Sequence, residues 1–330
     1  MKQALLTRRQ ILGGSAGGLA AIRLAVSGQA HAQVGRKLVR IVVGFPAGGS
    51  TDVLARILAE RLRLTHASTV MVENKPGASA RLAVEHVKNA EPDGSVLLFT
   101  PEGPIAVFPH SFRKLSYDPL GDLVPVAPMV KTMLAFNIGS VVPESVQSLP
   151  DFLQWCNANP NHATVATVPG SPPHFVAFML ASSAGVQIVH VPYRGGTAAL
   201  QDLLGAHIAG VITLISDALP LANSAARTLA VSGSQRSRFL PDVPTMRELG
   251  YDIAVEPWIG IFAPAKLAAE TLHMLNAAIG EAVNSPEMIE QLVKFGVDPM
   301  FQGPDEFAST VKASIDRWGS VVKASGFVAG

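Results

Sequence analysis

Hydrophobic positions along this chain follow two alternating periods. Short runs rich in Val and Ile predict buried strands, and segments whose apolar residues recur every three or four positions predict helices with one apolar face. The predicted strands are 39–43, 69–72, 95–99, 163–167, 188–192, 208–215 and 228–232. The predicted helices are one that begins near Thr51 and those at 80–88, 148–157, 173–184, 197–204, 219–226, 268–283, 286–295 and 304–324.

This alternation predicts an α/β fold in two blocks. Strands separated by helices of this length form right-handed βαβ units around parallel sheets. No flexible linker separates the blocks, so we expect two lobes joined by crossing strands at 130–138 and 253–263. The second crossing returns the chain to the first lobe, where the C-terminal helices are expected to pack. The predicted lobes are 33–133 with 254–330, and 134–253.

The first 32 residues have the pattern of an export signal. Arg8 and Arg9 precede a mild apolar stretch at 11–26, and an A-x-A motif ends at Ala32. The stretch is too short and too weakly apolar to remain as a membrane span. We expect a twin-arginine-type signal peptide at 1–32, cleavage after Ala32 and a periplasmic mature protein. An uncleaved anchor and export by the general route are the alternatives.

Cleavage would change the charge balance. It removes four of the chain's 26 basic residues and none of its 25 acidic ones, which leaves a net charge of −3. A mildly acidic chain without a basic tract has no electrostatic reason to bind nucleic acid, so no nucleic-acid partner is expected. The single cysteine, Cys156, excludes an internal disulfide. Its apolar neighbours predict a buried side chain rather than a nucleophile.

Signals of catalysis are weak in this sequence. The histidines show no metal-ligand spacing, and the G-x-S-x-G motif at 13–17 falls inside the predicted signal. We therefore expect no catalytic residue, metal or cofactor. His174, in the first turn of a predicted helix, is interpreted as structural.

Turns that follow strands and precede helices are the candidate ligand site, because ligands collect beyond the carboxyl ends of strands in open α/β sheets. In the first turn, Gly48 and Gly49 permit close approach to the backbone, while Ser50 and Thr51 add hydroxyls at a helix N-terminus. This combination suits a carboxylate. It is also compatible with an ordinary capped turn.

Three further turns and one aspartate offer polar groups that could contact the same ligand. Asp217 follows an apolar strand and could accept a hydrogen bond from a ligand or from water, or cap a helix at Leu219. The turns are 100–102, with Thr100 and Glu102; 168–173, with Ser171; and 193–197, with Gly196 and Thr197.

Several motifs together resemble the substrate-binding proteins of tripartite tricarboxylate transporters, the Bug or TctC family. The first is Ile41-Val42-Val43-Gly44-Phe45-Pro46-Ala47-Gly48-Gly49-Ser50-Thr51-Asp52. The others, in the same order along the chain, are 72–78, 92–94, 117–119, 191–195, 242–245 and 258–264.

The resemblance implies a two-lobed periplasmic binding protein fold of type II, which closes like a Venus flytrap on a small organic carboxylate. Implied ligands are dicarboxylates, tricarboxylates, acidic amino acids and aromatic acids. The implied partners are membrane transporter subunits, and we expect a monomer. A receptor for a signalling partner and an exported α/β hydrolase are the alternatives. The candidate ligand-binding residues are Ala47, Gly48, Ser50, Thr51, Thr100, Glu102, Ser171, Gly196, Thr197 and Asp217.

The chain also departs from the family pattern. Ser79-Ala80-Arg81 stands where glycines normally continue, and the loop before His174 reads Val168-Pro169-Gly170-Ser171. Arg81 could reach a second ligand carboxylate or lie solvated on its helix. Glu102 near the cleft would disfavour a densely anionic ligand.

Overall fold

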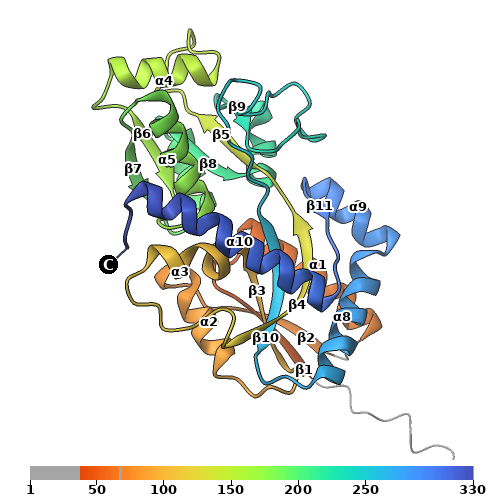
Figure 1. Cartoon of the computed structure of the whole chain (residues 1–330). Coiled ribbons are helices and arrows are strands. Elements are labelled where there is room, and N and C mark those ends of the chain that lie inside the picture. The colour runs from red at the N-terminus through yellow and green to blue at the C-terminus, as the bar shows by residue number, and fades with distance from the viewer. Residues whose placement is uncertain (1–37, 67–68, 330) are drawn as a thin grey trace, which may run out of the picture. The chain divides into compact units, whose positions relative to one another are not determined.

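The computed structural model of the chain describes residues 38–66 and 69–329, and there helices and strands alternate along the chain (Figure 1). The predicted signal at 1–32 and its G-x-S-x-G motif lie outside the described residues. Among the helices in the described ranges, none is both long and apolar enough to cross a bilayer.

The strands form two separate sheets. The first has six strands in the order β11-β4-β10-β3-β1-β2, and the second has five in the order β7-β6-β8-β5-β9. The strands of the first sheet are β1 (Leu38–Val43), β2 (Thr69–Asn74), β3 (Val96–Pro101), β4 (Leu123–Lys131), β10 (Trp258–Pro264) and β11 (Asp298–Pro299). Those of the second are β5 (Leu134–Ile138), β6 (Thr164–Thr167), β7 (Val189–Pro192), β8 (Gly210–Leu214) and β9 (Arg227–Val231).

Both sheets are mixed, which corrects the prediction of parallel sheets. β1 runs parallel to β2 and β3, but β10 is antiparallel to β3 and β4. In the second sheet β6 is parallel to β7 and β8, whereas β5 is antiparallel to β8 and β9. Of the antiparallel strands, β5 and β10 enter their sheets from the other one, whereas the two-residue β11, which is antiparallel to β4, follows α9. A strand that enters a sheet by a crossing therefore runs antiparallel to the parallel strands of the βαβ units in that sheet.

The two predicted crossings are confirmed. Residues 130–138 run from β4 in the first sheet directly into β5 in the second, and 253–263 lead back into β10. The first part of β4 was missed by the sequence analysis. Pro125 and Pro128 interrupt its apolar run, and prolines normally argue against a strand inside a sheet.

Helices cover both sheets. Their bounds match the predicted helices closely except at 219–226, where a 3₁₀ turn, η3 (Leu219–Asn223), follows the short α7 (Ile215–Ala218). Ser148 and Asp151 form the expected capping box at the start of α4 (Leu149–Ala158). The remaining helices are α1 (Ser50–Thr65), α2 (Arg81–Lys88), α3 (Phe108–Ser111), α4 (Leu149–Ala158), α5 (Pro172–Ala184), α6 (Gly196–Leu204), α8 (Ala269–Val283), α9 (Pro286–Phe295) and α10 (Pro304–Ser325), with the single turns η1 (Ala78–Ala80) and η2 (Gly103–Val107).

Each sheet has an apolar core on both faces. Leu54, Ile279 and Leu292 of α1, α8 and α9 pack on one face of the first sheet, while α2 and the first half of α10 cover the other. In the second sheet α4 and α5 share one core, which includes Cys156, and α6 covers the opposite face. Cys156 is fully buried, as predicted, and burial raises the pKa of its thiol to about 12.

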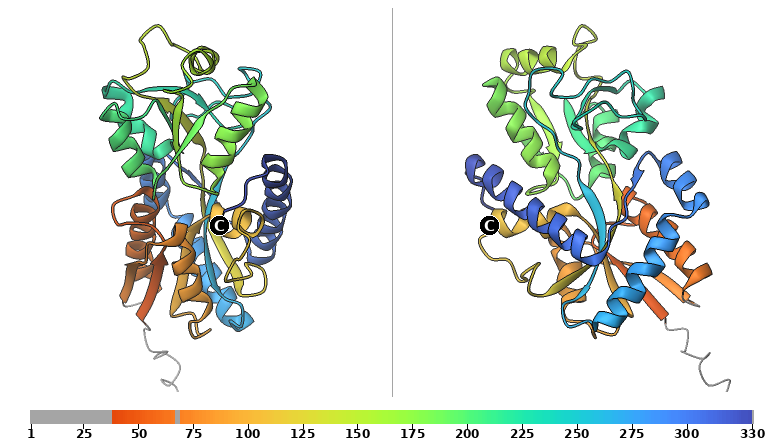
Figure 2. Two further views of the ribbon diagram at one scale, coloured as in Figure 1. Left: turned by 90° about the vertical axis from the view of Figure 1, so that its left-hand side faces the viewer. Right: turned by 45° about the vertical axis from the view of Figure 1, so that its right-hand side comes forward.

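The last helix spans the layers of both sheets, which corrects part of the prediction for the C-terminal helices. α8 and α9 pack on the first sheet, as expected. In α10, Phe307 packs beside Trp258 of the first sheet, but Trp318 lies against Phe175 of α5. Figures 1 and 2 show the helix running from the first sheet's layer towards α5. At 22 residues, or about 33 Å, α10 is long enough to reach both layers.

Candidate functional site

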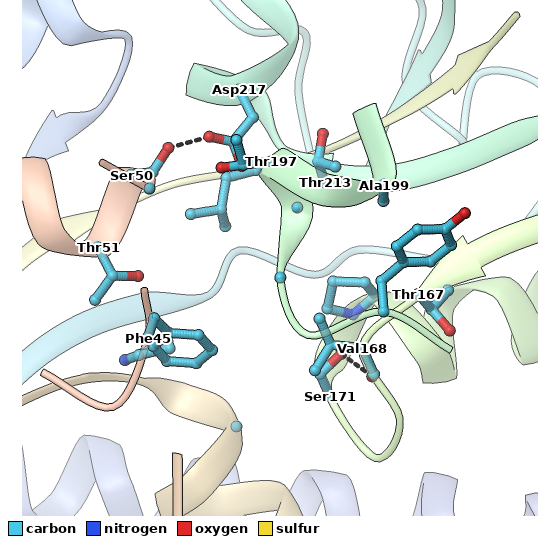
Figure 3. Close-up of a pocket in the computed structure, with 18 of the residues that line it drawn as sticks. Phe45, Ser50, Thr51, Thr167, Val168, Ser171, Thr197, Ala199, Thr213 and Asp217 are labelled. Carbon is cyan, nitrogen blue, oxygen red and sulfur yellow. Dashed lines mark hydrogen bonds between the residues drawn. The ribbon is translucent and has the colours of Figure 1, made fainter. Parts of the chain in front are cut away.

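A cavity of about 380 Å³ opens where the carboxyl ends of strands from both sheets face each other (Figure 3). It is lined by the turns after β1, β3, β6 and β7 and by the segment from β8 into α7. Its size falls in the range that is usual for small-molecule sites.

The structure brings eight of the ten candidate ligand-binding residues to this cavity. They are Ala47, Ser50, Thr51, Glu102, Ser171, Gly196, Thr197 and Asp217. Gly48 and Thr100 do not line it. The Gly48 N–H donates to Asp52, and the buried Thr100 hydroxyl donates to the Pro101 carbonyl. Whether any of these residues touches a ligand stays a prediction.

The first turn is held in shape by Asp52, a buried residue that the sequence analysis did not single out for this role. Its carboxylate accepts hydrogen bonds from the Gly48 N–H at 2.9 Å, from the Asn74 side chain at 2.8 Å and from two nitrogens of Arg56. Asn74 also donates to the Phe45 carbonyl at the other end of the turn. Burial alone would raise the pKa of Asp52, but these bonds together hold it below its usual range.

This anchoring leaves the N-terminus of α1 open towards the cavity. Within the described part of the chain, the N–H groups of Ser50 and Thr51 in its first turn have no hydrogen-bond partner. The Thr51 hydroxyl is also without a partner there, although the residue is only 8% exposed. It points into the open space of the cavity (Figure 3). Donors that face a cavity without a partner are available to an acceptor that enters it.

The N-terminus of α6 faces the same end of the cavity from the second sheet. Gly196 and Thr197 occupy its first turn, and their N–H groups are unpaired within the ranges that the structure describes. A Cβ atom on Gly49 would lie 3.7 Å from the Thr197 hydroxyl, so the turns before α1 and α6 approach each other closely.

Asp217 lies at this end of the cavity as well. It accepts a hydrogen bond from the Ser50 hydroxyl, so the helix-capping role considered from the sequence is wrong. A Cβ atom on Gly196 would lie only 2.9 Å from the Asp217 carboxylate, which explains why a glycine stands at that position. Burial raises the pKa of Asp217 to about 6, and the Ser50 hydroxyl offsets only part of this effect.

Glu102 lines the cavity, but its carboxylate is turned towards α10. The side chain is fully buried, and its Oε1 accepts hydrogen bonds from Arg317 and from the Trp318 indole N–H, both at 2.9 Å. Burial raises the pKa of Glu102, while the nearby Arg317 guanidinium opposes that increase. The carboxylate therefore couples the turn after β3 to the last helix.

The turn after β6 forms the opposite wall of the cavity. The Ser171 hydroxyl donates to the Val168 carbonyl at 2.6 Å, and the Gly170 N–H donates to Nδ1 of His174 at 3.0 Å. Burial and the nearby His190 ring lower the pKa of His174 to about 4, which keeps this nitrogen an acceptor. His174 thus has the structural role that the sequence analysis assigned to it.

The segment that lacks the expected glycines adopts the backbone geometry that favours glycine. Ala78, Ser79 and Ala80 have φ angles of 48°, 55° and 73°, in the left-handed region that costs ordinary residues about 1–2 kcal/mol each. Ser79 lines the cavity. Arg81 does not: its guanidinium stacks over Phe112 at 4.1 Å and donates to the Ala78 carbonyl. Neither alternative considered for Arg81 describes this arrangement.

The residues that sequence reasoning missed are mostly apolar. Phe45, Pro101, Pro104, Phe108 and Pro172 line the cavity. Pro101 and Pro172 lie in turns predicted from the sequence but were not named as candidates, and nothing in the local sequence of Phe45, Pro104 and Phe108 distinguishes them from ordinary core residues. Arg194 is the one cationic side chain among the described lining residues, and it is exposed.

Comparisons with known proteins agree with this architecture. Residues 54–327 match the model of the tripartite tricarboxylate transporter family receptor. Protein BugT of Bordetella pertussis is 32% identical over 292 residues, which cover 87% of this chain and 89% of BugT.

Three solved structures are similar over almost their whole length. The periplasmic binding protein BugD is 27% identical with a TM-score of 0.82, covering 88% of this chain and 98% of BugD. Rpa4515 of R. palustris with adipate is 27% identical with a TM-score of 0.85, covering 89% and 99%. MatC of Rhodopseudomonas palustris with bound malate is 28% identical with a TM-score of 0.79, covering 87% and 99%. The chain has the two-lobed α/β fold of periplasmic binding proteins and belongs to the receptor family of the tripartite tricarboxylate transporters.

Proposed function

We propose that this chain is a periplasmic receptor that binds a small organic carboxylate in the cavity and presents it to a membrane transporter of the tripartite tricarboxylate type. The observation that carries the proposal is the set of unpaired donors at one end of the cavity. The first turns of α1 and α6 and the Thr51 hydroxyl all direct donors to that end. Two relatives of the same fold, Rpa4515 and MatC, are described with adipate and with malate.

These donors suit an anion for two physical reasons. Unpaired N–H groups at a helix N-terminus add to the positive end of the helix dipole. Each hydrogen bond to a charged acceptor contributes about 1.5–3 kcal/mol, so a few of them suffice for micromolar binding. The proposed contacts are Ala47, Ser50 and Thr51 on one side, with Ser171, Gly196 and Thr197 on the other. Asp217 would contact the ligand directly or through water.

Ligand capture would involve movement of the two lobes, 33–133 with 254–330 and 134–253, about the two crossings. Both crossings are single stretches of chain, one between β4 and β5 and one before β10, and the second half of α10, which packs on α5, would have to shift against it. The donors of α1 and of α6 lie in different lobes. Closure would therefore bring both sets onto one carboxylate and exclude water from it.

The proposed location depends on the signal at 1–32. If it is cleaved after Ala32, the protein purified from the periplasm begins at Gln33. N-terminal sequencing of that material tests this directly. A protein that keeps residues 1–32 would contradict the export proposal.

The binding proposal is tested by Thr51→Val, which removes the unpartnered hydroxyl and nearly preserves the side-chain volume. We expect about a tenfold weaker affinity for the retained carboxylate, with an unchanged fold. Thr65→Val is the matched control, because Thr65 ends the same helix and donates only to the Arg61 carbonyl. The double variant Ser50→Ala with Thr51→Ala should also bind more weakly than the wild type, because it too lacks the Thr51 hydroxyl.

The measurement begins with native mass spectrometry of the periplasmic protein, to identify a retained acid. Titration calorimetry with that acid follows. Equal affinities for wild type, Thr51→Val and the double variant would refute this placement of the ligand. A chemically altered acid after incubation would refute the receptor proposal itself.

A further inference from the structure

The two ends of the cavity differ sharply in the hydrogen-bond donors that they offer. α1 and α6 meet at one end, with unpaired N–H groups in both first turns. α5 also begins at the cavity, but its first two residues are Pro172 and Pro173. Proline has no N–H group, so only His174 among the first three helical residues of α5 retains one.

The side chains at the α5 end replace only part of the missing donors. The Thr167 hydroxyl lies at this end without a hydrogen-bond partner among the described residues (Figure 3). The Ser171 hydroxyl donates to the Val168 carbonyl, and the Gly170 N–H donates to His174. Pro101, Pro104 and Phe108 extend the apolar surface of Pro172 and Pro173 along the wall formed by the turn after β3 and by η2 and α3. Figure 3 places Ser171 and Val168 on the side of the cavity away from Ser50 and Asp217.

Charged groups do not supply a second anion site inside the cavity either. Among the lining residues that the structure describes, the ionisable side chains other than Tyr193 are Glu102, Arg194 and Asp217. Glu102 and Asp217 are acidic, and Arg194 is exposed. A carboxylate beside an exposed arginine remains largely solvated and screened.

From this asymmetry we infer that the ligand is a monocarboxylate with an apolar body, an aromatic or medium-chain acid, rather than a dicarboxylate. Its carboxylate lies between the N-termini of α1 and α6, and its body lies against the proline and phenylalanine wall. This inference rests on the proposed function and narrows its ligand class. A second carboxylate at the α5 end would lose its hydration and gain few donors there, the Thr167 hydroxyl among them.

Matched pairs of acids test this inference on the mature chain freed of retained ligand. Hexanoate and adipate share six carbons, and benzoate and terephthalate share a ring, but the second acid of each pair carries an additional carboxylate. Titration calorimetry should find each monocarboxylate bound at least tenfold more tightly than its partner. Equal or tighter binding of adipate and terephthalate would overturn the inference and leave the receptor proposal standing. Failure of all four acids and of malate to bind would overturn the receptor proposal and this inference with it.

Two variants identify the cause of the preference. Pro172→Ala with Pro173→Ala restores two N–H groups at the start of α5, and it should narrow the hexanoate-to-adipate affinity ratio at least threefold. Pro286→Ala, at the same helical position of α9 and outside the cavity lining, is the matched control and should leave the ratio unchanged. Arg194→Gln should also leave it unchanged. A preference for adipate that Arg194→Gln abolishes would place a second carboxylate at Arg194 and overturn the inference.

Discussion

Replacement of Asp217 by asparagine is the most informative single change, because it removes the charge and keeps an acceptor for the Ser50 hydroxyl. Burial raises the pKa of Asp217 from 3.8 to about 6 in the folded protein. Between these values the folded chain binds a proton that the unfolded chain does not. Stability therefore falls as the pH rises from about 4 to about 6, and the loss persists above that window.

The size of this loss follows from the pKa difference. At about 1.36 kcal/mol per pKa unit, the ionised carboxylate costs the folded state about 3 kcal/mol at pH 7.5 and about 1 kcal/mol at pH 4.5. Asp217→Asn should therefore exceed the wild type in unfolding free energy by about these amounts. Urea unfolding followed by tryptophan fluorescence measures both differences. Asp316→Asn, at an exposed aspartate of α10, is the control and should show no such pH dependence.

The same variant reports on ligand binding. A carboxylate placed beside Asp217 is repelled unless Asp217 is protonated, so wild-type affinity should fall about tenfold for each pH unit above 6. The affinity of Asp217→Asn should be nearly independent of pH and about tenfold higher than wild type at pH 7. A variant that binds more weakly at every pH would refute this reasoning. That result would mean that the ionised Asp217 accepts a hydrogen bond from the ligand.

Two further predictions concern stability. Ala80 has a left-handed backbone with φ of 73°, so Ala80→Gly should raise the unfolding free energy by about 0.5–1 kcal/mol. Ala83→Gly in the adjoining helix is the control and should lower it by about 1 kcal/mol. Thermal unfolding measures both changes, and a loss of stability in both variants would contradict backbone strain at Ala80. Arg317→Ala leaves the buried Glu102 carboxylate without its cation and should cost about 2–3 kcal/mol at pH 8. The cost should be smaller at pH 5, because burial raises the pKa of Glu102 and favours its protonation. Lys312→Ala, from an exposed ion pair on the same helix, should cost less than about 0.5 kcal/mol at either pH, and an equal cost in both variants would refute the role of Glu102.

Periodicity alone predicted most of the helices and strands, because burial of one face leaves a local record in the sequence. Residues 286–295 were predicted as a helix and form one with those bounds. The glycines and hydroxyls at 48–51 marked the turn that leads into α1. The expectation that ligands collect beyond the carboxyl ends of strands led to ten candidate residues, and eight of them line one cavity. Export of the chain and contact of these residues with a ligand stay predictions.

Tertiary structure decided the features that join distant parts of the chain. Asp52 and Asn74 hold the first turn across 22 residues, and Glu102 meets Arg317 across 215. The antiparallel direction of β5 and β10 depends on which strands cross between the sheets. The path of α10 depends on where the second crossing returns the chain to the first sheet. The wall of prolines and phenylalanines at the α5 end depends on turns that come together only in the folded chain. The sequence by itself determined the elements and the turn chemistry, because these depend on neighbours a few positions away. Only the fold determined strand direction, the pKa of Asp217 and the two unlike ends of the cavity, because these depend on burial between segments that no local pattern relates.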